Sequence, residues 1–406
     1  KASLELKLID PKINLRVHKN THFNYYILGS ELTKEGLGFP QYSNDEIVIP
    51  GLLSKGYSLE DARNYVVAAC WEFIIPGNGM DIPNIAALSF AKIIDKSIKR
   101  HLDNCDDFES FLTKVKFEAK LELDTILSKI GNIYMEPAPF QSLLMNDCIE
   151  NAKDISLGAK YNNYGIHGTG ISTAADSLAA IKKFVFDDKS VHAKEIVNAL
   201  ENNFEDDPDL WQKLKYQAPK MGNDDDYVDN IAVELLEMFS ELTINLKNDR
   251  GGCFRPGSGS AMYYLWHVRD IGASADGRKK GEPLSANFSP SLNVKVNGPL
   301  SVISSFSKPD LKKIMNGGPL TLELHDTLFR NRDSIQKVAF LVKSYIDMGG
   351  HQLQLNAVNR ERLIEAKKYP ELHKNLIVRV WGWSGYFVEL DEEYQDHVIQ
   401  RIELQT

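Results

Sequence analysis

The stretch that decides the fold is Ile377-Val378-Arg379-Val380-Trp381-Gly382-Trp383-Ser384-Gly385-Tyr386-Phe387-Val388, close to the end of the chain. A β-branched run leads into it, Gly382 and Gly385 stand at its tip, and an aromatic and aliphatic run leads out. Glycine adopts backbone conformations that other residues avoid, so this pattern predicts a β-hairpin. By turn chemistry alone, both glycines serve the turn and have no further role.

The composition around this hairpin is that of an ordinary globular protein. The chain has 406 residues, of which 43% are apolar and 25% are charged, enough for two ordinary domains or one large α/β barrel. No apolar run reaches the roughly 18 residues of a membrane span. The formal net charge of −9, with no basic stripe, argues against nucleic acid. We therefore expect a protein that binds neither membrane nor nucleic acid.

The cysteines and the N-terminus indicate the compartment. Cys70, Cys105, Cys148 and Cys253 are widely spaced and form no C-x-x-C pair, so we expect no disulfide framework, no structural zinc and a cytoplasmic location. The first residues lack the apolar core of a signal peptide and do not begin with Met. We expect either a fragment or a chain from which an earlier segment was lost.

Periodicity predicts strands that alternate with helices. An acid three residues after Ser58 predicts a helix start there, and Leu353 to Val358 alternates as a strand. Helices are expected over residues 85–130 (largely), 174–186, 227–246, 334–348 with Gly349 as C-cap, and 392–404, and long loops over 251–299. This alternation predicts an α/β fold with parallel strands, without internal repeats or low-complexity linkers.

Cys70-Trp71-Glu72 is the second stretch that could carry chemistry, because it ends an apolar segment of strand-like length. Taken alone, it reads as a buried thiol at a strand end beside a surface glutamate.

A family resemblance changes both interpretations. Arg379-Val380, Gly382, the aromatic after it and Tyr386-Phe387-Val388 resemble the C-terminal signature of the glycyl radical enzymes. The run from Gly36 to Glu72 resembles the active-site region of the glycyl radical lyases, which include diol and hydroxyproline dehydratases, choline lyase and arylacetate decarboxylases. Further stretches in family order are 164–170, 174–178, 222–226, 276–284, 289–291 and 350–354. The interval from Cys70 to Gly382 is also similar to that of the family.

The resemblance implies roles for three residues. Gly382 would hold a backbone radical, which its amide and carbonyl neighbours delocalise, Cys70 would become a thiyl radical, and Glu72 would act as general acid/base on a small oxygenated substrate. A radical-SAM activating enzyme would install the radical, and no bound cofactor or metal is expected. The implied reaction is cleavage of a C–O, C–N, C–S or C–C bond.

The resemblance also implies an architecture. The chain matches the C-terminal half of a ten-stranded α/β barrel, with residues 1–360 as the half-barrel and catalytic Cys loop and residues 361–406 as a glycyl radical domain. Because a half-barrel exposes sheet edges and apolar faces, we expect an N-terminal half or companion chain as a partner. A homo-oligomer is expected as well.

Departures from the family pattern bear on the reaction. Ala69, Trp71 and Phe73 replace the Gly, Val and Pro that flank the cysteine and glutamate in the dehydratases, so the pocket beside the thiol should differ. Gly385 usually matches alanine and is interpreted as structural. The acyl-transferring members need two adjacent cysteines, which Ala69-Cys70 lacks. A formate C-acetyltransferase-like reaction and a non-catalytic fragment that partners another radical enzyme are the alternatives.

Four further positions keep two interpretations each. His167 is either a loop histidine or a substrate contact. Arg278 holds loops or acts in catalysis, and His351 and Gln352 line the passage of the radical loop or cap a helix. Asp224 to Asp226 mark a metal site or a helix N-terminus.

Overall fold

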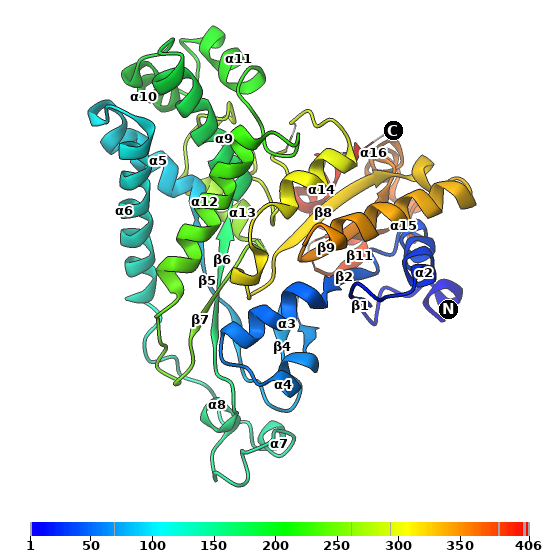
Figure 1. The fold of residues 1–406 in the computed structure, drawn as a ribbon. Coiled ribbons are helices and arrows are strands. Elements are labelled where there is room, and N and C mark those ends of the chain that lie inside the picture. The colour runs from blue at the N-terminus through cyan, green and yellow to red at the C-terminus, as the bar shows by residue number, and fades with distance from the viewer. Residues whose placement is uncertain are drawn as a thin grey trace.

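The computed structural model describes residues 2–68, 70–260, 262–292, 294–380, 382–400 and 403–404. Its two main sheets lie side by side, and helices cover them (Figure 1); we call these two sheets together the wall. A five-stranded sheet has the order β1-β2-β9-β8-β12, and a three-stranded sheet has the order β5-β6-β7. The bounds of these strands are β1 Asn14–Val17, β2 Gln41–Asn44, β5 Ile82–Ser89, β6 Tyr164–Thr169, β7 Phe254–Gly257, β8 Pro319–His325, β9 Gln352–Val358 and β12 Glu403–Leu404.

The strands β5 to β9 follow one another along this wall in chain order. β5 and β6, β6 and β7, and β8 and β9 pair in parallel. The step from β7 toward β8 is made by two backbone hydrogen bonds, from Asn316 N to Pro256 O (2.9 Å) and from Ser258 N to Gly317 O (2.8 Å). β2 then adds antiparallel to β9, and β1 adds parallel to β2. The prediction of an α/β fold with parallel strands is confirmed.

Long helices cover the outer face of the strands: α5, α12 and α15 each bury one apolar side, whereas every residue of α9 is buried. In α12, Ile231, Leu235 and Phe239 are buried, and this helix packs on α9. The long helices are α5 Phe90–His101, α6 Phe108–Leu127, α9 Ile171–Ile181 with a π-helical extension Lys182–Asp187, α12 Asp226–Thr243 and α15 Arg332–Asp347. The helices predicted over 227–246 and 334–348 are confirmed with small shifts. Met348 is the C-cap of α15, so the prediction of Gly349 as cap is wrong by one residue.

Three other sequence expectations need correction. The region predicted as largely helical from Ile85 begins with strand β5, and α5 starts only where the Ser89 side chain accepts a hydrogen bond from Lys92 N. The segment 251–299, expected as loop, contains β7. The predicted tail helix ends at Gln400, and residues 403–404 pair in parallel with β8.

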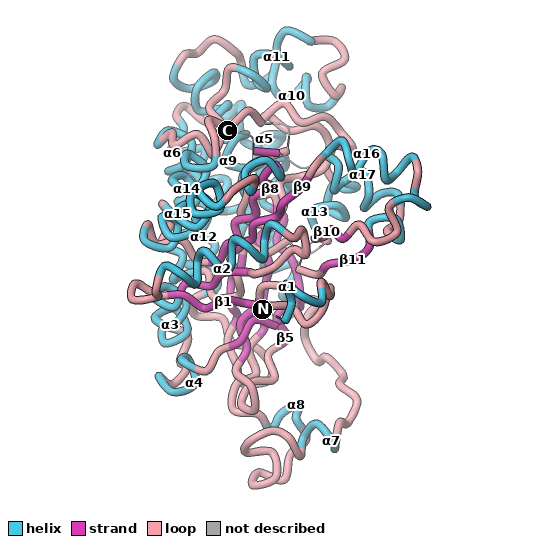
Figure 2. Tube along the Cα trace, turned by 90° about the vertical axis from the view of Figure 1, so that its right-hand side faces the viewer, coloured by secondary structure: helices cyan, strands magenta, loops and turns pink. Residues whose placement is uncertain are grey.

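Two short hairpins complete the framework around the site. One joins β3 Val66–Ala68 to β4 Glu72–Ile74, and the other joins β10 Ile377–Arg379 to β11 Ser384–Tyr386, both antiparallel. The hairpin predicted at the end of the chain is thus confirmed. Figure 2 shows β10, β11, α16 (Arg360–Lys368) and α17 (Glu392–Gln400) on the opposite side of the wall from α12, α14 (Pro299–Ser307) and α15.

The remaining helices lie at the periphery. α7 and α8 belong to an excursion that projects from the body of the molecule (Figures 1 and 2). The bounds are α1 Ala2–Leu6, α2 Phe23–Lys34, α3 Asp45–Ser54, α4 Leu59–Arg63, α7 Pro139–Ser142, α8 Ile155–Gly158, α10 Ala193–Glu201, α11 Pro208–Tyr216 and α13 Tyr263–Trp266. Ser58 caps α4 as predicted, since its side chain accepts from Asp61 N. Among the described residues, no helix combines the length and the apolar character needed to cross a bilayer.

Candidate functional site

The tips of the two hairpins meet, and this contact brings Cys70 and Gly382 together. Gly382 has φ +85°, and a Cβ added to it would lie 2.5 Å from Cys70 Sγ and closer still to Cys70 Cβ. Because a carbon–carbon bond is about 1.5 Å long, the Gly382 Cα lies within about 4 Å of the sulfur. Two residues from opposite ends of the chain are therefore in direct contact, at a place where only glycine fits.

The Glu72 side chain accepts hydrogen bonds from the backbone at the tip of its own hairpin, the cysteine hairpin formed by β3 and β4. Its Oε2 accepts hydrogen bonds from the backbone N of Cys70 and of Trp71, each at 2.9 Å. The glutamate is 1% exposed, so these bonds replace water around a buried carboxylate. Cys70 itself is half-buried.

His167 on β6 is the side chain that faces the other oxygen of Glu72. Its Nε2 lies 3.1 Å from Glu72 Oε1, an ion-pair distance with imperfect hydrogen-bond alignment. Burial alone would raise the pKa of Glu72, but His167 and the Trp71 N–H lower it below the usual 4.5. Of the two interpretations of His167, the structure places it beside Glu72 and inside the wall, not in a surface loop.

The backbone of the cysteine tip is held by side chains from other elements. Lys12 Nζ and Gln41 Nε2 donate to the Cys70 carbonyl oxygen at 2.7 and 2.9 Å. Gln352 Nε2 donates to the Trp71 carbonyl oxygen at 2.9 Å. Sequence reasoning missed Lys12 and Gln41, because no local pattern links a residue before β1, or the first residue of β2, to a hairpin far downstream.

The thiol stays protonated in this setting. Burial, followed by the charge of Glu72, raises the pKa of Cys70 to about 11, against the opposing charges of Lys12 and Arg379. Burial and the Arg379 charge lower the pKa of Lys12 to about 8. The sulfur is therefore a poor thiolate nucleophile near neutral pH.

The glycine hairpin rests on the loop between α2 and β2. Ser384 Oγ donates to the Leu37 carbonyl oxygen at 2.8 Å, and Arg379 Nη1 donates to Ser384 Oγ at 3.3 Å. Gly38 has φ +74°, and a Cβ there would lie 2.7 Å from Arg379 Cδ. This close approach fixes the position of the glycine hairpin relative to the loop between α2 and β2. Ala69 and Trp381, which flank the two tip residues, lie outside the described residues.

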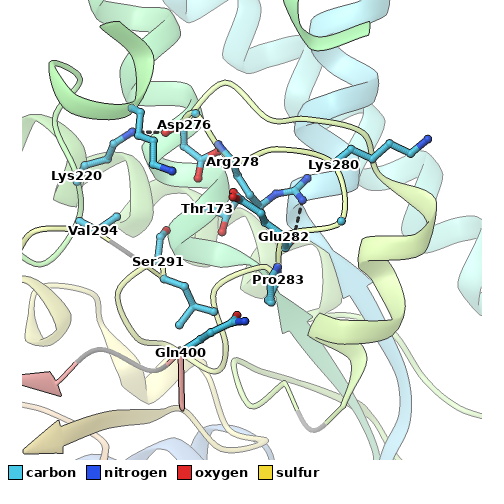
Figure 3. Close-up of a pocket in the computed structure, with 14 residues that line it drawn as sticks. Thr173, Lys220, Asp276, Arg278, Lys280, Glu282, Pro283, Ser291, Val294 and Gln400 are labelled. Atoms are coloured by element: carbon cyan, nitrogen blue, oxygen red, sulfur yellow. Dashed lines mark hydrogen bonds between the residues drawn. The ribbon is translucent and has the colours of Figure 1, made fainter. Parts of the chain in front are cut away.

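Other stretches singled out in the sequence converge on a second place (Figure 3). Asp176 accepts hydrogen bonds from Met221 N (2.7 Å) and Ser291 Oγ (2.8 Å), and Lys220 Nζ donates to the Asp276 carbonyl oxygen (2.7 Å). A cavity of about 360 Å³ opens beside this network. These hydrogen bonds join the stretches to one another at a place other than the contact between the two hairpins.

Arg278 and the aspartates have structural partners. The Arg278 guanidinium donates to Ser274 Oγ and to the carbonyl oxygens of Gly272, Lys279 and Glu282, so it holds the loop as the structural interpretation expects. The Asp225 side chain accepts from Tyr227 N and caps α12, which favours the helix N-terminus over a metal site. Within the described ranges, no group of three or more His, Cys, Asp or Glu is placed to bind a metal ion.

His351 precedes β9 and Gln352 begins it, and neither caps one of the described helices. The His351 ring packs edge-on against Phe73 with centroids 5.3 Å apart, and Gln352 contacts the cysteine tip. Both residues therefore contact the cysteine hairpin, His351 through Phe73 and Gln352 through the Trp71 carbonyl oxygen.

Comparisons with known proteins agree with this geometry. Residues 1–265 match the family described as pyruvate formate lyase-like, and residues 284–388 match the glycine radical family. Trans-4-hydroxy-L-proline dehydratase from Clostridioides difficile is 32% identical over 422 residues, which cover 98% of this chain and 53% of the relative. Isethionate sulfite-lyase from Nitratidesulfovibrio vulgaris is 30% identical, covering 99% of this chain and 51% of the relative.

A solved structure shares the fold along the whole chain. The glycerol-bound B12-independent glycerol dehydratase from Clostridium butyricum superposes with a TM-score of 0.94 at 32% identity, covering 100% of this chain and 54% of that chain. The chain thus spans about half the length of the curated relatives it matches. The wall of strands is half of the α/β barrel found in these proteins, as predicted.

Proposed function

This chain is a member of the pyruvate formate lyase-like family of glycyl radical enzymes, and we propose that it is a glycyl radical lyase in which Gly382 stores the radical, Cys70 moves hydrogen and Glu72 moves a proton. The substrate class is a small molecule that carries a hydroxyl next to the bond that breaks. Isethionate and glycerol, printed in the names of two relatives above, each carry a hydroxyl on the carbon next to the bond that breaks, which supports this class. Trans-4-hydroxy-L-proline has only the hydroxyl that a dehydratase removes, so that relative supports the lyase reaction and not this substrate class.

The observation that carries the proposal is the contact between Gly382 and Cys70. The hydrogen of Gly382 that takes the place of a Cβ points at the Cys70 side chain, with Sγ 2.5 Å from that Cβ position. Removing this hydrogen leaves a backbone radical that can flatten without a side chain in the way. The raised pKa of Cys70 keeps the S–H bond that such a transfer needs.

The proposed steps balance as follows. The Gly382 radical first takes the hydrogen of the Cys70 S–H bond, and the resulting sulfur radical takes a hydrogen atom from the substrate carbon that bears the hydroxyl. This second transfer restores S–H and leaves a carbon radical. Glu72 takes the hydroxyl proton while the leaving group departs from the neighbouring carbon with its bonding electron pair. The new carbonyl product radical takes the hydrogen back from Cys70, and the sulfur then takes the hydrogen of Gly382.

Glu72 has the acceptor capacity for its part. A carboxylate offers about four lone-pair directions, and the backbone N–H groups of Cys70 and Trp71 occupy Oε2. Oε1 faces His167 and retains one direction for a substrate hydroxyl. The lowered pKa of Glu72 keeps it ionised, as a base must be before it accepts a proton.

Acyl transfer is the weaker candidate. A second sulfur beside the first would be needed to carry the acyl group, and the residue before Cys70 is alanine. We therefore favour the lyase over a formate C-acetyltransferase-like reaction.

Two macromolecular partners belong to the proposal. A radical-SAM activating enzyme, with an iron–sulfur cluster and S-adenosylmethionine, would install the radical at Gly382. A companion segment would supply the remainder of the barrel. We further propose that residues 361–406 act as the glycyl radical domain, since Leu363, Val378, Phe387 and Val398 share a small core of their own.

Anaerobic activation followed by electron paramagnetic resonance tests the proposal. The single hydrogen left on Gly382 should split the signal into a doublet, which Gly382→Ala should abolish. Cys70→Ala should keep the doublet but lose turnover of trans-4-hydroxy-L-proline, glycerol, 1,2-propanediol and isethionate, supplied as a panel. A wild-type protein that never shows the doublet, or turnover that survives Cys70→Ala, would overturn it.

A further inference from the structure

His167 sits in the middle of the parallel wall, directly behind the cysteine hairpin. In the β-sheet register it lies between Ala87 on β5 and Gly257 on β7, two small residues that leave room for an imidazole. A Cβ added to Gly259 would lie 3.3 Å from the His167 ring and 3.5 Å from Trp71 Cδ1. The ring is therefore packed against the cysteine hairpin and has no freedom to turn toward solvent.

Among the described residues, Glu72 is the charged group in contact with the His167 ring. The side chain is fully buried, and within the described part of the chain neither ring nitrogen has an aligned hydrogen-bond partner. Its one charged contact is Glu72 Oε1, 3.1 Å from Nε2. A buried imidazole without any partner is unfavourable, so the contact with Glu72 accounts for a histidine at this position. Catalytic hydrogen bonds are often misaligned before substrate binds and tighten afterwards.

We propose that His167 is a positioning residue that donates its Nε2–H to Glu72 Oε1, keeps Glu72 ionised, and thereby fixes the one lone pair that receives the substrate hydroxyl. This inference rests on the proposed function and adds the group that sets the protonation of its base. The two backbone bonds to Oε2 orient the carboxylate, and His167 completes the arrangement from β6.

Among the described residues, the other ionisable groups near Glu72 and His167 either contact other partners or are uncharged. On β7, Arg255 forms an ion pair with Asp81 at 3.3 Å, which partly compensates the positive charge of the arginine. Lys12 contacts the Cys70 carbonyl oxygen. At the start of β9, burial lowers the pKa of His351 to about 3, so that ring is neutral. Cys70 is a thiol. Among the described side chains, His167 is the donor within contact of Oε1.

Infrared difference spectroscopy can read the protonation of Glu72 without substrate or radical. The spectrum of the Glu72→Gln variant, subtracted from that of the parent, isolates the Glu72 carboxyl bands as pH is lowered. In His167→Leu the protonated carboxyl band should appear at a higher pH, because one of the groups that oppose the effect of burial on Glu72 is then gone. His167→Gln, which keeps an amide donor, should restore the carboxylate.

His397→Leu is the matched control, because it removes another buried histidine, one that packs against Tyr264 on α13. It should leave the Glu72 bands unchanged, whatever its effect on stability. Equal Glu72 bands in His167→Leu and the parent would overturn the inference. So would a shift that His167→Gln fails to reverse. Absence of a glycyl radical after activation would instead count against the proposed function, because the infrared result does not depend on activation.

Discussion

Lys12 Nζ lies 2.7 Å from the Cys70 carbonyl oxygen, and Gln41 Nε2 shares that oxygen at 2.9 Å. Lys12, which precedes β1, and Gln41, which begins β2, thus fix the position of the tip of the cysteine hairpin. Lys12→Met should lower the free energy of unfolding by about 1 kcal/mol, because one partner of the carbonyl remains. The Lys12→Met/Gln41→Leu double variant should lose more than the sum of the single changes, since the carbonyl then loses both.

Urea unfolding of the parent, Lys12→Met, Gln41→Leu and the double variant measures this coupling. Lys55→Met serves as the control for loss of a partly buried lysine elsewhere. Strict additivity of the two changes would show that Lys12 and Gln41 do not act on a shared acceptor.

Gly382 and Gly385 should respond differently to the same substitution. Gly382→Ala forces a side chain into φ +85° and against Cys70, so it should lose about 1–3 kcal/mol of stability and all radical signal. Gly385 has no positive φ, and its added Cβ would meet only the ring of Trp383, a half-exposed side chain that can move. Thermal unfolding and electron paramagnetic resonance of both variants check this, and equal damage from both would contradict the assignment of Gly382.

The sequence predicted the parts of this site that local chemistry encodes. The glycine hairpin and the Ser58 cap follow from nearby residues, and the family motifs supplied Cys70, Glu72 and Gly382. The sequence predicts helix from Ile85 where the structure has strand β5, because Ile82–Ser89 shows no regular alternation of apolar and polar residues and runs directly into α5. β7 was hidden by Pro256 and Gly257, which usually interrupt strands. The pairing of Glu72 with His167 depends on how β6 lies behind the hairpin, and no spacing in the sequence carries that information.

Cys70 should titrate well above an ordinary thiol. Burial and the Glu72 charge raise its pKa to about 11 from 9.0, so at pH 8 its thiolate fraction should be lower on the order of 100-fold. In a protein with Cys105, Cys148 and Cys253 changed to serine, the rate of alkylation by iodoacetamide should keep rising beyond pH 10. Glu72→Gln should move the midpoint down. A rate that levels off near pH 9 would contradict the raised pKa.

Asp176 should make stability depend on pH. Burial raises its pKa to about 7 from 3.8, so the folded state holds a proton that the unfolded state releases between these values. Its contribution is complete below about pH 4 and is lost as pH rises through about 7, by about 4 kcal/mol at most. The free energy of unfolding of Asp176→Asn, relative to the parent, should therefore rise across this range. The exposed Asp106→Asn should show no such trend, and a flat difference for Asp176→Asn would refute the raised pKa.

The last prediction concerns the open margins of the wall. In the described residues β1 pairs only with β2 and β5 only with β6, which leaves an edge on each side. Tyr25, 56% exposed, lines a cavity of about 140 Å³ together with Leu15 of β1, and Leu6 and Leu8 are 64% and 54% exposed. If a companion segment closes the barrel here, the chain alone should bind an apolar dye, and Tyr25→Lys should reduce that binding. Tyr216→Lys, on α11 and 69% exposed, should reduce it less. A monomer that binds no dye would show that these margins need no cover.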